Sequence, residues 1–325
     1  MSVPKLRFKE FDGDWSEKII SDIADVRGGK RLPKGYSLVE SDTGYPYITV
    51  TDMEDGTVNC DKIRYVPLDA VDQIKRYRIT VDDIYISVAG TLGLVGIIPH
   101  ELNNANLTEN ADKLTNIKCD QKYLLQYLNN GSLSQLIDSV STVGAQPKLA
   151  LYAIQGMSIF LPANPEQTKI ASFLSAVDEK ISQLSQKHEL LSQYKQGMMQ
   201  KLFSQEIRFK ADDGSEFGEW ENSYIGNECK ITTGNKDTQN KVDDGLYPFF
   251  VRSQTVEKIN SYSMDCEAIL TSGDGVGVGK NYHYINGKFD FHQRVYCLYE
   301  FSERLIGRYL YIYFSNYFYD RVKRL

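Results

Sequence analysis

The chain has 325 residues, of which 42% are hydrophobic and 25% are charged, and this ordinary globular composition excludes a fibrous or disordered protein. Its length exceeds that of one typical domain, so we expect two compact units and a connecting segment. The formal net charge of −6 argues against binding nucleic acid by bulk charge alone, because neutralised phosphates supply most of such affinity.

Neither a targeting signal nor a metal site is expected. The opening sequence, MSVPKLRFKEFDGDW, is charged throughout and lacks the apolar core of a secretory signal. The longest uncharged stretch, IYISVAGTLGLVGIIP from Ile84, is too short and too rich in glycine to cross a bilayer. Five cysteines and four histidines are scattered without zinc-binding spacing, so we expect buried free thiols and no metal. The sequence predicts a cytoplasmic protein.

The opening of the chain returns about two hundred residues later. LRFKEFDGDWSEKIISDIADVRGGKRLP begins at Leu6, and IRFKADDGSEFGEWENSYIGNECKITTGNKDT begins at Ile207. Each copy carries Arg-Phe-Lys and one of the only two tryptophans, Trp15 and Trp220. Later segments keep the same order in both copies. The first copy has YPYITVTDM, DIYISVAGTLGLVG and YLLQYLNNGS, and the second has, at the matching places, YPFFVRSQT, EAILTSGDGVGVG and YLYIYFSNYF. The chain therefore contains one domain type twice.

Each copy mixes strands with short helices. Runs of β-branched and aromatic residues bounded by Gly, Asp and Asn predict strands at YPYITV, DIYISVA, AILTS and RVYCLYEF. Helical patches are expected around residues 124–140 and 305–319. The predicted fold class is α/β, in the mixed α+β sense, with domains at residues 1–163 and 207–325.

The glycine-rich segment SGDGVGVGKN, residues 272–281, resembles a phosphate-binding loop but departs from it. Asp274 stands where the first glycine is required, and Lys280 is followed by Asn281 rather than by a hydroxyl residue. The first copy carries three glycines at the matching place, namely Gly90, Gly93 and Gly96. We therefore expect a turn shared by both copies, not a nucleotide site.

Residues 164–206, between the copies, are the clearest periodic segment. Pro165 and Glu166 suit the first turn of a helix. Apolar residues at alternating spacings of four and three predict a coiled-coil seam made of Ile170, Leu174, Val177, Ile181, Leu184, Leu191, Met198 and Leu202. Flanking positions are mostly polar, which favours a helix-on-helix seam over a helix lying on its own domain. At 1.5 Å per residue, residues 166–204 would span about 58 Å, comparable to one and a half turns of DNA.

Three features resemble the specificity subunits of type I restriction-modification systems. They are the tandem repeat, the opening LRFKEFDGDW, and GAQPKLALYAIQGMSIFLPANPEQTKIASFLSAVDEKI from Gly144. The last is similar to the family's junction, where a Leu-Pro strand end leads through Pro-x-Glu-Gln into a long conserved helix. The resemblance implies two target-recognition domains separated by an antiparallel pair of long helices, each domain reading half of a bipartite site in double-stranded DNA.

The resemblance also implies partners and cofactors. Methylation subunits would transfer a methyl group from S-adenosylmethionine to adenine N6, and a restriction subunit would use ATP and Mg²⁺, so this chain would be non-catalytic and hold no cofactor. Consistent with this, the sequence lacks the Asn-Pro-Pro-aromatic signature of adenine methyltransferases. An alternative is an acidic decoy that binds the methylation subunit without reading DNA.

The family's second long helix has no counterpart after the second domain. We expect a C-terminally shortened form, whose exposed seam is covered by a methylation subunit, a second copy or a separate chain.

Base reading requires side chains that reach base edges, chiefly Arg or Lys to guanine and Asn or Gln to adenine, while Lys, Ser and Thr also hold phosphates. Candidates in the first domain are Arg27, Lys30, Arg31, Lys34, Thr49, Thr51, Thr91, Gln146 and Lys148. Candidates in the second domain are Arg252, Ser253, Gln254, Lys280, His292, Gln293 and Arg294.

Overall fold

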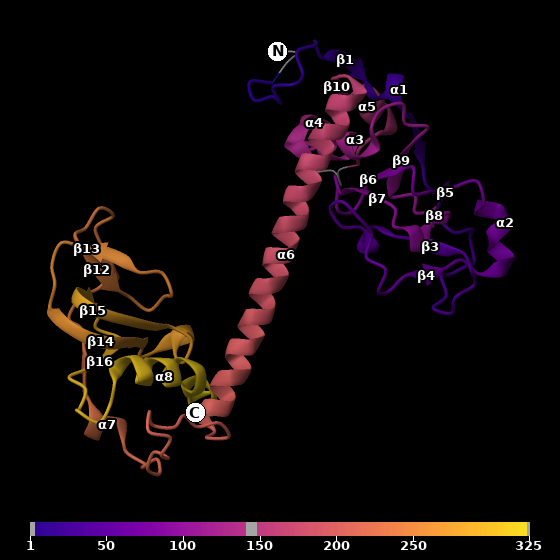
Figure 1. The fold of residues 1–325 in the computed structure, drawn as a ribbon. Helices are drawn as coiled ribbons and strands as arrows, with labels where there is room; N and C mark the ends of the chain where they lie inside the picture. The colour runs from indigo at the N-terminus through magenta and orange to yellow at the C-terminus, as the bar shows by residue number, and fades with distance from the viewer. Residues whose placement is uncertain (1–3, 141–147, 324–325) are drawn as a thin grey trace. The chain divides into compact units, whose positions relative to one another are not determined.

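The computed structural model describes residues 4–140 and 148–323, and the chain divides into two compact units, Met1–Leu190 and Leu191–Leu325 (Figure 1). The division falls inside the predicted long helix, α6 (Asn164–Phe203), so each unit contains part of it. The mixed α/β fold class is confirmed. The boundaries predicted at residues 163 and 206 stay a prediction. No described helix is long and apolar enough to span a membrane.

The described part of unit 1 contains three sheets. The two-stranded sheet pairs β1 (Ser16–Ile19) with β10 (Ser158–Leu161), which joins the start of the unit to the segment before α6. One four-stranded sheet has the order β2 (Asp25–Gly28), β9 (Ala111–Thr115), β6 (Ile84–Ser87) and β7 (Val95–Ile97). The other has the order β4 (Arg64–Tyr65), β3 (Pro46–Ile48), β8 (Ala105–Leu107) and β5 (Arg78–Ile79).

Short helices complete unit 1. They are α1 (Ile20–Ile23), α2 (Val71–Ile74), α3 (Gln121–Tyr127), α4 (Leu133–Val140) and α5 (Leu151–Gln155). The helical patch expected around residues 124–140 is confirmed as α3 and α4, with a kink at Gly131, whose φ is 95°. Fully buried Ile84, Leu114 and Leu124 belong to the core that α1, α3, α4 and α5 share with the first four-stranded sheet.

Unit 2 has one six-stranded sheet. Its order is β11 (Lys230–Thr233), β16 (Val295–Tyr299), β14 (Met264–Ser272), β15 (Tyr282–Phe291), β12 (Tyr247–Phe250) and β13 (Glu257–Ile259). The short helix α7 (Ile225–Glu228) precedes β11, and the predicted C-terminal helix is α8 (Gly307–Val322), which packs on β14 and β15. The strands predicted in both copies are confirmed as β3, β6, β14 and β16.

Strand pairing aligns the two units residue by residue. In unit 1, β3 runs parallel to β8 with Ile48 opposite Leu107; in unit 2, β12 runs parallel to β15 with Phe250 opposite Phe291. The next residue closes the same hydrogen bond in both, because the N–H of Thr108 donates to Ile48 (3.1 Å) and that of His292 donates to Phe250 (2.9 Å). The repeat read from the sequence is thus a repeat of strand register.

Antiparallel pairing gives the same alignment elsewhere in the sheets. Ser87 at the end of β6 lies opposite Ala111 of β9, and Ser272 at the end of β14 lies opposite Val295 of β16. Strand β15 pairs with β14 as β7 pairs with β6, and with β12 as β8 pairs with β3. The long strand β15 of unit 2 therefore occupies the places that the two short strands β7 and β8 occupy in unit 1.

One glycine in each unit lets two backbones meet. A Cβ atom on Gly29, after β2, would overlap the carbonyl oxygens of Leu107 and Thr108. A Cβ atom on Gly234, after β11, would overlap that of Phe291. The two glycines occupy equivalent places, and only glycine fits there.

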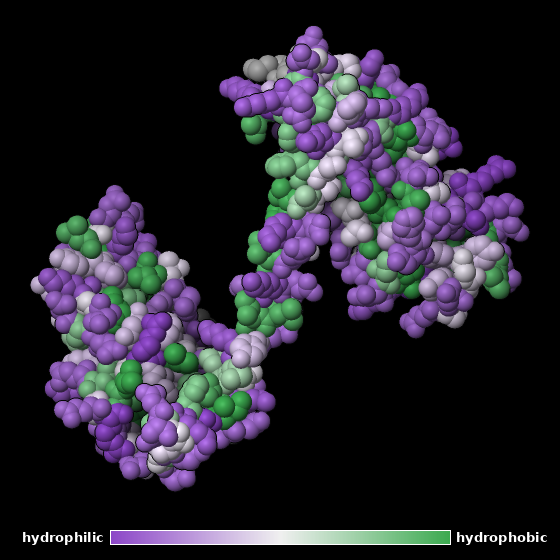
Figure 2. Space-filling view, viewed as in Figure 1, coloured by the Kyte–Doolittle hydropathy of each residue, from purple (hydrophilic) through white to green (hydrophobic). Residues whose placement is uncertain are grey.

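The middle of the α6 seam is uncovered by the described residues. Val177, Ile181, Leu184 and Leu191 are 41%, 57%, 53% and 56% exposed, and hydrophobic residues are visible along the helix surface in Figure 2. The remaining seam positions, Ile170, Leu174, Met198 and Leu202, are partly buried at the two ends of the helix. The helix thus presents an apolar stripe of the kind expected for a helix partner.

We predict that Gly29→Ala and Gly234→Ala each lower the free energy of unfolding by about 2–3 kcal/mol, because the added methyl group forces two backbones apart. Urea unfolding of the full chain, with hydrogen exchange to assign the affected unit, measures this. The controls are Gly13→Ala and Gly218→Ala, since a Cβ atom at either position meets nothing within 4 Å. Equal effects in all four variants would contradict the close approach.

Candidate nucleic-acid interface

Four loops meet in unit 1. Three of them follow β2, β3 and β6, and the fourth connects β8 to β9. We call them together, residues 29–34, 49–52, 88–94 and 108–110, the unit 1 loop cluster. Backbone hydrogen bonds join them, since the N–H of Lys30 donates to Leu107 (2.8 Å) and that of Val88 donates to Asn110 (2.7 Å). Side chains from separated parts of the chain are therefore held together by the backbone.

The corresponding loops meet in unit 2. Three of them follow β11, β12 and β14, and the fourth connects β15 to β16. We call them together, residues 234–237, 251–254, 273–281 and 292–294, the unit 2 loop cluster. The N–H of Gln293 donates to Lys236 and that of Gly273 donates to Arg294, both at 2.9 Å. Most of the candidate DNA-binding residues fall within these two clusters.

In unit 1, three candidates line one hollow of about 340 Å³. They are Arg31, Thr49 and Thr51, and the hollow is also lined by Arg64 and Asn110. The exposed Arg31 guanidinium donates from Nε to Glu109, whose carboxylate holds the side chain in place. The Thr49 hydroxyl donates to Asp52 (2.6 Å), so it stabilises its loop.

The other unit 1 candidates are spread more widely. Lys30, Lys34 and Thr91 are exposed in the loop cluster, and the Lys30 ammonium lies 5.6 Å from the centre of the Tyr77 ring. Lys148 is exposed, and its charge acts on buried Asp112, whose pKa is raised by burial despite that attraction. Arg27 lies inside β2, bound to Asp25 (2.9 Å), and not at the strand end. Gln146 lies outside the described residues.

In unit 2, two candidate arginines share one carboxylate. Asp274 Oδ1 accepts from Arg252 Nη1 (2.7 Å), and Oδ2 accepts from Arg294 Nη1 (3.1 Å). The hydrogen bond from Arg252, more than any other cause, lowers the pKa of the Asp274 carboxyl. The side chains of Arg252 and Arg294 are 40% and 56% exposed, so both guanidinium groups remain open to solvent.

The glycine-rich segment is the turn that positions these arginines. The Asn281 amide donates to the Arg252 carbonyl (2.9 Å) and to the Ser272 hydroxyl (3.2 Å). Gly275 and Gly279 have φ values of 75° and 71°, as Gly90 and Gly93 have 81° in the first copy. The expectation of a recurring turn is confirmed.

His292 is buried, which corrects its assignment as a DNA contact. The residue is 3% exposed, and its Nδ1 accepts a hydrogen bond from the backbone N–H of Arg294 (2.9 Å). The ring must therefore be neutral with its proton on Nε2. His292 shapes the loop that presents Arg294, and it does not face solvent.

The remaining unit 2 candidates lie around the arginines. Gln254 is exposed. Ser253 donates to the Thr255 carbonyl (2.9 Å), and Gln293 donates to Asp237 (3.3 Å). Lys280 is exposed, with its ammonium 5.9 Å from the centre of the Tyr319 ring.

The side chains that hold the candidate arginines were not predicted in that role. Asp274 and Asn281 were noted only as departures from a phosphate-binding loop, Glu109 lies in no motif, and Arg64 reaches the unit 1 hollow from β4. The available signal was the register of the repeat: Ser272 of β14 lies opposite Val295 of β16, which brings the loop that carries Asp274 next to Arg294.

The described residues contain no group of three or more His, Cys, Asp or Glu side chains that could hold a metal ion. The five cysteines are free, and Cys229 and Cys297 are buried as expected. Cys60 is exposed, so the expectation of burial was wrong for that residue.

A second surface in unit 1 joins the opening of the chain to the start of α6. Arg7 forms a two-pronged ion pair with buried Glu166, with Nε–Oε1 and Nη2–Oε2 distances of 2.6 and 2.7 Å. The Phe8 ring packs edge-on against Phe173 with centroids 5.8 Å apart. The Arg-Phe-Lys motif of the first copy therefore anchors the first turns of a long helix.

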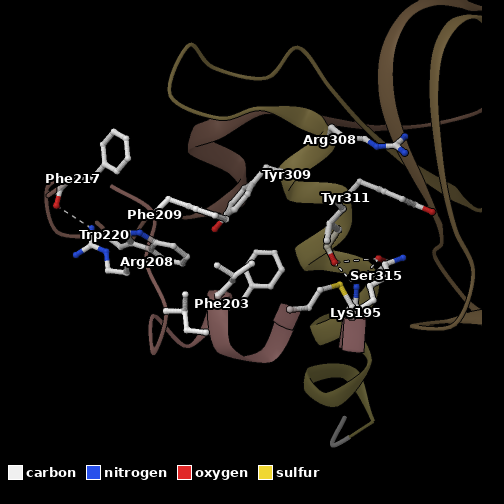
Figure 3. A pocket seen from close by; sticks show the side chains of 15 residues that line it. Lys195, Phe203, Arg208, Phe209, Phe217, Trp220, Arg308, Tyr309, Tyr311 and Ser315 are labelled. Atoms are coloured by element: carbon white, nitrogen blue, oxygen red, sulfur yellow. Dashed lines mark hydrogen bonds between the residues drawn. The ribbon is translucent and has the colours of Figure 1, made fainter. Parts of the chain in front are cut away.

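The second Arg-Phe-Lys motif borders an apolar hollow of about 710 Å³ in unit 2 (Figure 3). Phe203 contacts Tyr309 there, and Phe209 and Trp220 remain 71% and 44% exposed. Arg208, which matches Arg7, donates to the backbone carbonyls of residues 217 and 218. The first turns of α8 and the last turns of α6 line this hollow.

Acidification should loosen the loop around Arg294. Burial, the largest cause, lowers the pKa of His292 from 6.5. Below about pH 6.5 the unfolded chain therefore binds a proton that the folded chain refuses, and stability falls as the pH falls. We predict that the hydrogen-exchange protection of the Arg294 amide decreases over this range. His283, which is shifted in the same direction, makes this local readout preferable to global stability.

The control is His292→Asn, which keeps an acceptor but cannot be protonated. Its Arg294 amide should show no such pH dependence. The same loss of protection in the variant would contradict the assigned hydrogen bond.

Comparison with known proteins connects these surfaces to one family. Residues 12–193 match the family model described as the type I restriction modification DNA specificity domain. A Methanocaldococcus jannaschii protein named "Putative type I restriction enzyme MjaX specificity subunit" is 27% identical over 267 residues, which cover 75% of this chain and 60% of that protein. The type I restriction enzyme EcoDI specificity subunit of Escherichia coli is 36% identical over 80 residues, 25% of this chain and 17% of that protein. The chain thus spans less than two thirds of either relative.

Two solved structures share the fold. The S subunit of a type I restriction-modification system from M. genitalium has a TM-score of 0.61 at 15% identity, covering 100% of this chain and 82% of that chain. A chain from a study of complex assembly and conformational transition of the type I R-M system has a TM-score of 0.54 at 13% identity, covering 95% and 80%. Since the family model matches more than half of the chain, the protein belongs to the type I restriction-modification specificity subunits.

Proposed function

We propose that the protein is the DNA-recognition subunit of a type I restriction-modification complex, in which each unit reads one half of a bipartite site. One observation carries the proposal. The two loop clusters are built on the same strand register but present different side chains, with Arg31 held by Glu109 in unit 1 and two arginines held by Asp274 in unit 2. A backbone arrangement that is the same in both units but carries different side chains suits the recognition of two different half-sites.

The acidic net charge is compatible with this role. Guanidinium groups held by carboxylates contribute little excess charge, so they favour contacts with base edges over indiscriminate phosphate binding. Exposed Lys30, Lys34 and Lys280, close to the arginines in sequence or in the loop clusters, are suited to the phosphates on either side.

We assign the chemistry to partner subunits. Methylation subunits would bind S-adenosylmethionine and modify adenine, and a restriction subunit would use ATP and Mg²⁺. This chain would carry no cofactor and catalyse no step, and it would act in the cytoplasm on the host's DNA.

Assembly would depend on α6. We propose that a second long helix covers its exposed seam, supplied by a methylation subunit, a second copy or a separate chain. Unit 1 offers the pattern for how such a helix begins, because Arg7 holds the Glu166 carboxylate in the first turn of α6. In unit 2, Arg208 and the neighbouring aromatic hollow would receive the first turn of the partner helix in the same way.

The proposal predicts a bipartite methylation motif with a fixed gap. The measurement is co-expression of this chain with its cognate methylation subunit, followed by genome-wide mapping of modified adenines. Arg31→Ala should relax one half of the motif only, because it removes a reader from one unit. Lys18→Ala, an exposed cation on β1 outside both loop clusters, is the control and should change nothing.

Absence of any motif from a complex that still assembles would contradict DNA reading and favour the decoy alternative. The decoy would also show no DNA binding that weakens with salt, whereas a reader of several phosphates loses affinity steeply as salt rises.

The assembly proposal predicts protection in hydroxyl-radical footprinting. Phe209 and Trp220 of the unit 2 hollow and Ile181 and Leu184 of the seam should react in the chain alone and become protected in the complex with the methylation subunits. Tyr224, 82% exposed and outside the hollow, should react equally in both states. Continued reactivity of the hollow in an active complex would contradict helix docking there.

A further inference from the structure

Asp274 brings two arginines from distant parts of the chain into one fixed group. Arg252 follows β12, Asp274 follows β14 and Arg294 precedes β16, and both guanidinium groups donate to the two oxygens of the single carboxylate. All three side chains are about half exposed. We call them the Arg-Asp-Arg trio.

The backbone beneath the trio is pinned on both sides. The Asn281 amide holds the Arg252 carbonyl at 2.9 Å. Buried His292 accepts the Arg294 N–H at 2.9 Å, and the Arg294 carbonyl accepts the N–H of Gly273 at 2.9 Å. The side chains therefore start from a fixed frame, which reduces the entropy lost when they bind a ligand.

The chemistry of the trio favours a neutral acceptor edge over a phosphate. A phosphate close to both guanidinium groups would also approach the Asp274 carboxylate, and two anions repel each other. The major-groove edge of guanine offers the acceptors O6 and N7 without a charge, and a guanidinium group donates to both at once. Adenine places an amino donor at the same position, which meets the guanidinium donors unfavourably.

Unit 1 lacks this group at the equivalent positions. Gly90 in unit 1 and Gly275 in unit 2 are matching positions, and each lies next to the residue in question. A Cβ atom on Gly90 would lie 3.9 Å from the Val50 side chain, and a Cβ atom on Gly275 would lie 3.6 Å from Arg252 Nη1. Val50 therefore corresponds to Arg252.

The other two members align through the backbone. The N–H of Val88 donates to Asn110 as that of Gly273 donates to Arg294, so Ala89 corresponds to Asp274 and Asn110 to Arg294. Val50, Ala89 and Asn110 cannot form the trio, so the two half-sites are read differently at this position.

Resting on the proposed function, we infer that the trio makes unit 2 select guanine in its half-site, with Asp274 acting as the positioning residue. The test uses the full chain co-expressed with its cognate methylation subunit and maps methylated adenines for single variants. Arg252→Ala and Arg294→Ala should each be examined, together with Asp274→Asn, which keeps the shape but removes the charge.

The expected wild-type motif has a guanine in one half. At least one arginine variant should lower the preference for guanine there by about ten- to a hundredfold, with the other half unchanged. Asp274→Asn should relax the same position while overall DNA affinity is kept or rises, because a negative charge is removed. A residue needed only for folding would lower affinity and specificity together.

Arg304→Ala is the matched control, because Arg304 is an exposed arginine of unit 2 paired with Glu221 (2.7 Å) outside the loop cluster. Co-purification with the methylation subunit verifies folding of every variant. A relaxed position that is an A·T pair, or a uniform loss of methylation with an unchanged motif, would overturn the inference. So would a bipartite wild-type motif without guanine in the affected half, whereas a wild type with no motif would sink the proposed function itself.

Discussion

The loop clusters depend on backbone pairing between strands that are far apart in the sequence. In each unit a strand runs parallel to another, and the first residue after the pair closes one more backbone hydrogen bond, from Thr108 to Ile48 and from His292 to Phe250. Backbone bonds are indifferent to side-chain identity. The frame can therefore stay constant while the loops change, provided that Gly29 and Gly234 keep the backbones in contact.

Carboxylates determine how the exposed arginines behave. A free arginine on a surface samples many rotamers and loses about 2 kcal/mol of entropy when it is fixed. Glu109 and Asp274 limit that freedom before any ligand arrives, and they also cancel part of the positive charge. An acidic protein can therefore still read DNA as proposed. Its arginines are oriented before binding, and this orientation contributes affinity that less selective proteins obtain from net positive charge.

Local patterns in the sequence were sufficient for the repeat, the strands and the long helix. The paired tryptophans and the four-and-three spacing on α6 report on neighbours close in sequence, so one chain is enough to read them. The roles of His292 and Asp274 depend on which strands pair, and this is fixed by long-range contacts. Sequence reasoning accordingly named His292 as a reader although it is buried, and treated Asp274 only as an obstacle to phosphate binding.

The proposed function requires that both loop clusters face DNA. The decisive measurement is a structure of the chain assembled with its methylation subunits on a duplex that carries the mapped site. We expect Arg31 in one major groove and the Arg-Asp-Arg trio in another, with the loops after β3 and β12 lying closest to the bases. Bases contacted by other surfaces of the two units, with both clusters facing solvent or protein, would contradict it.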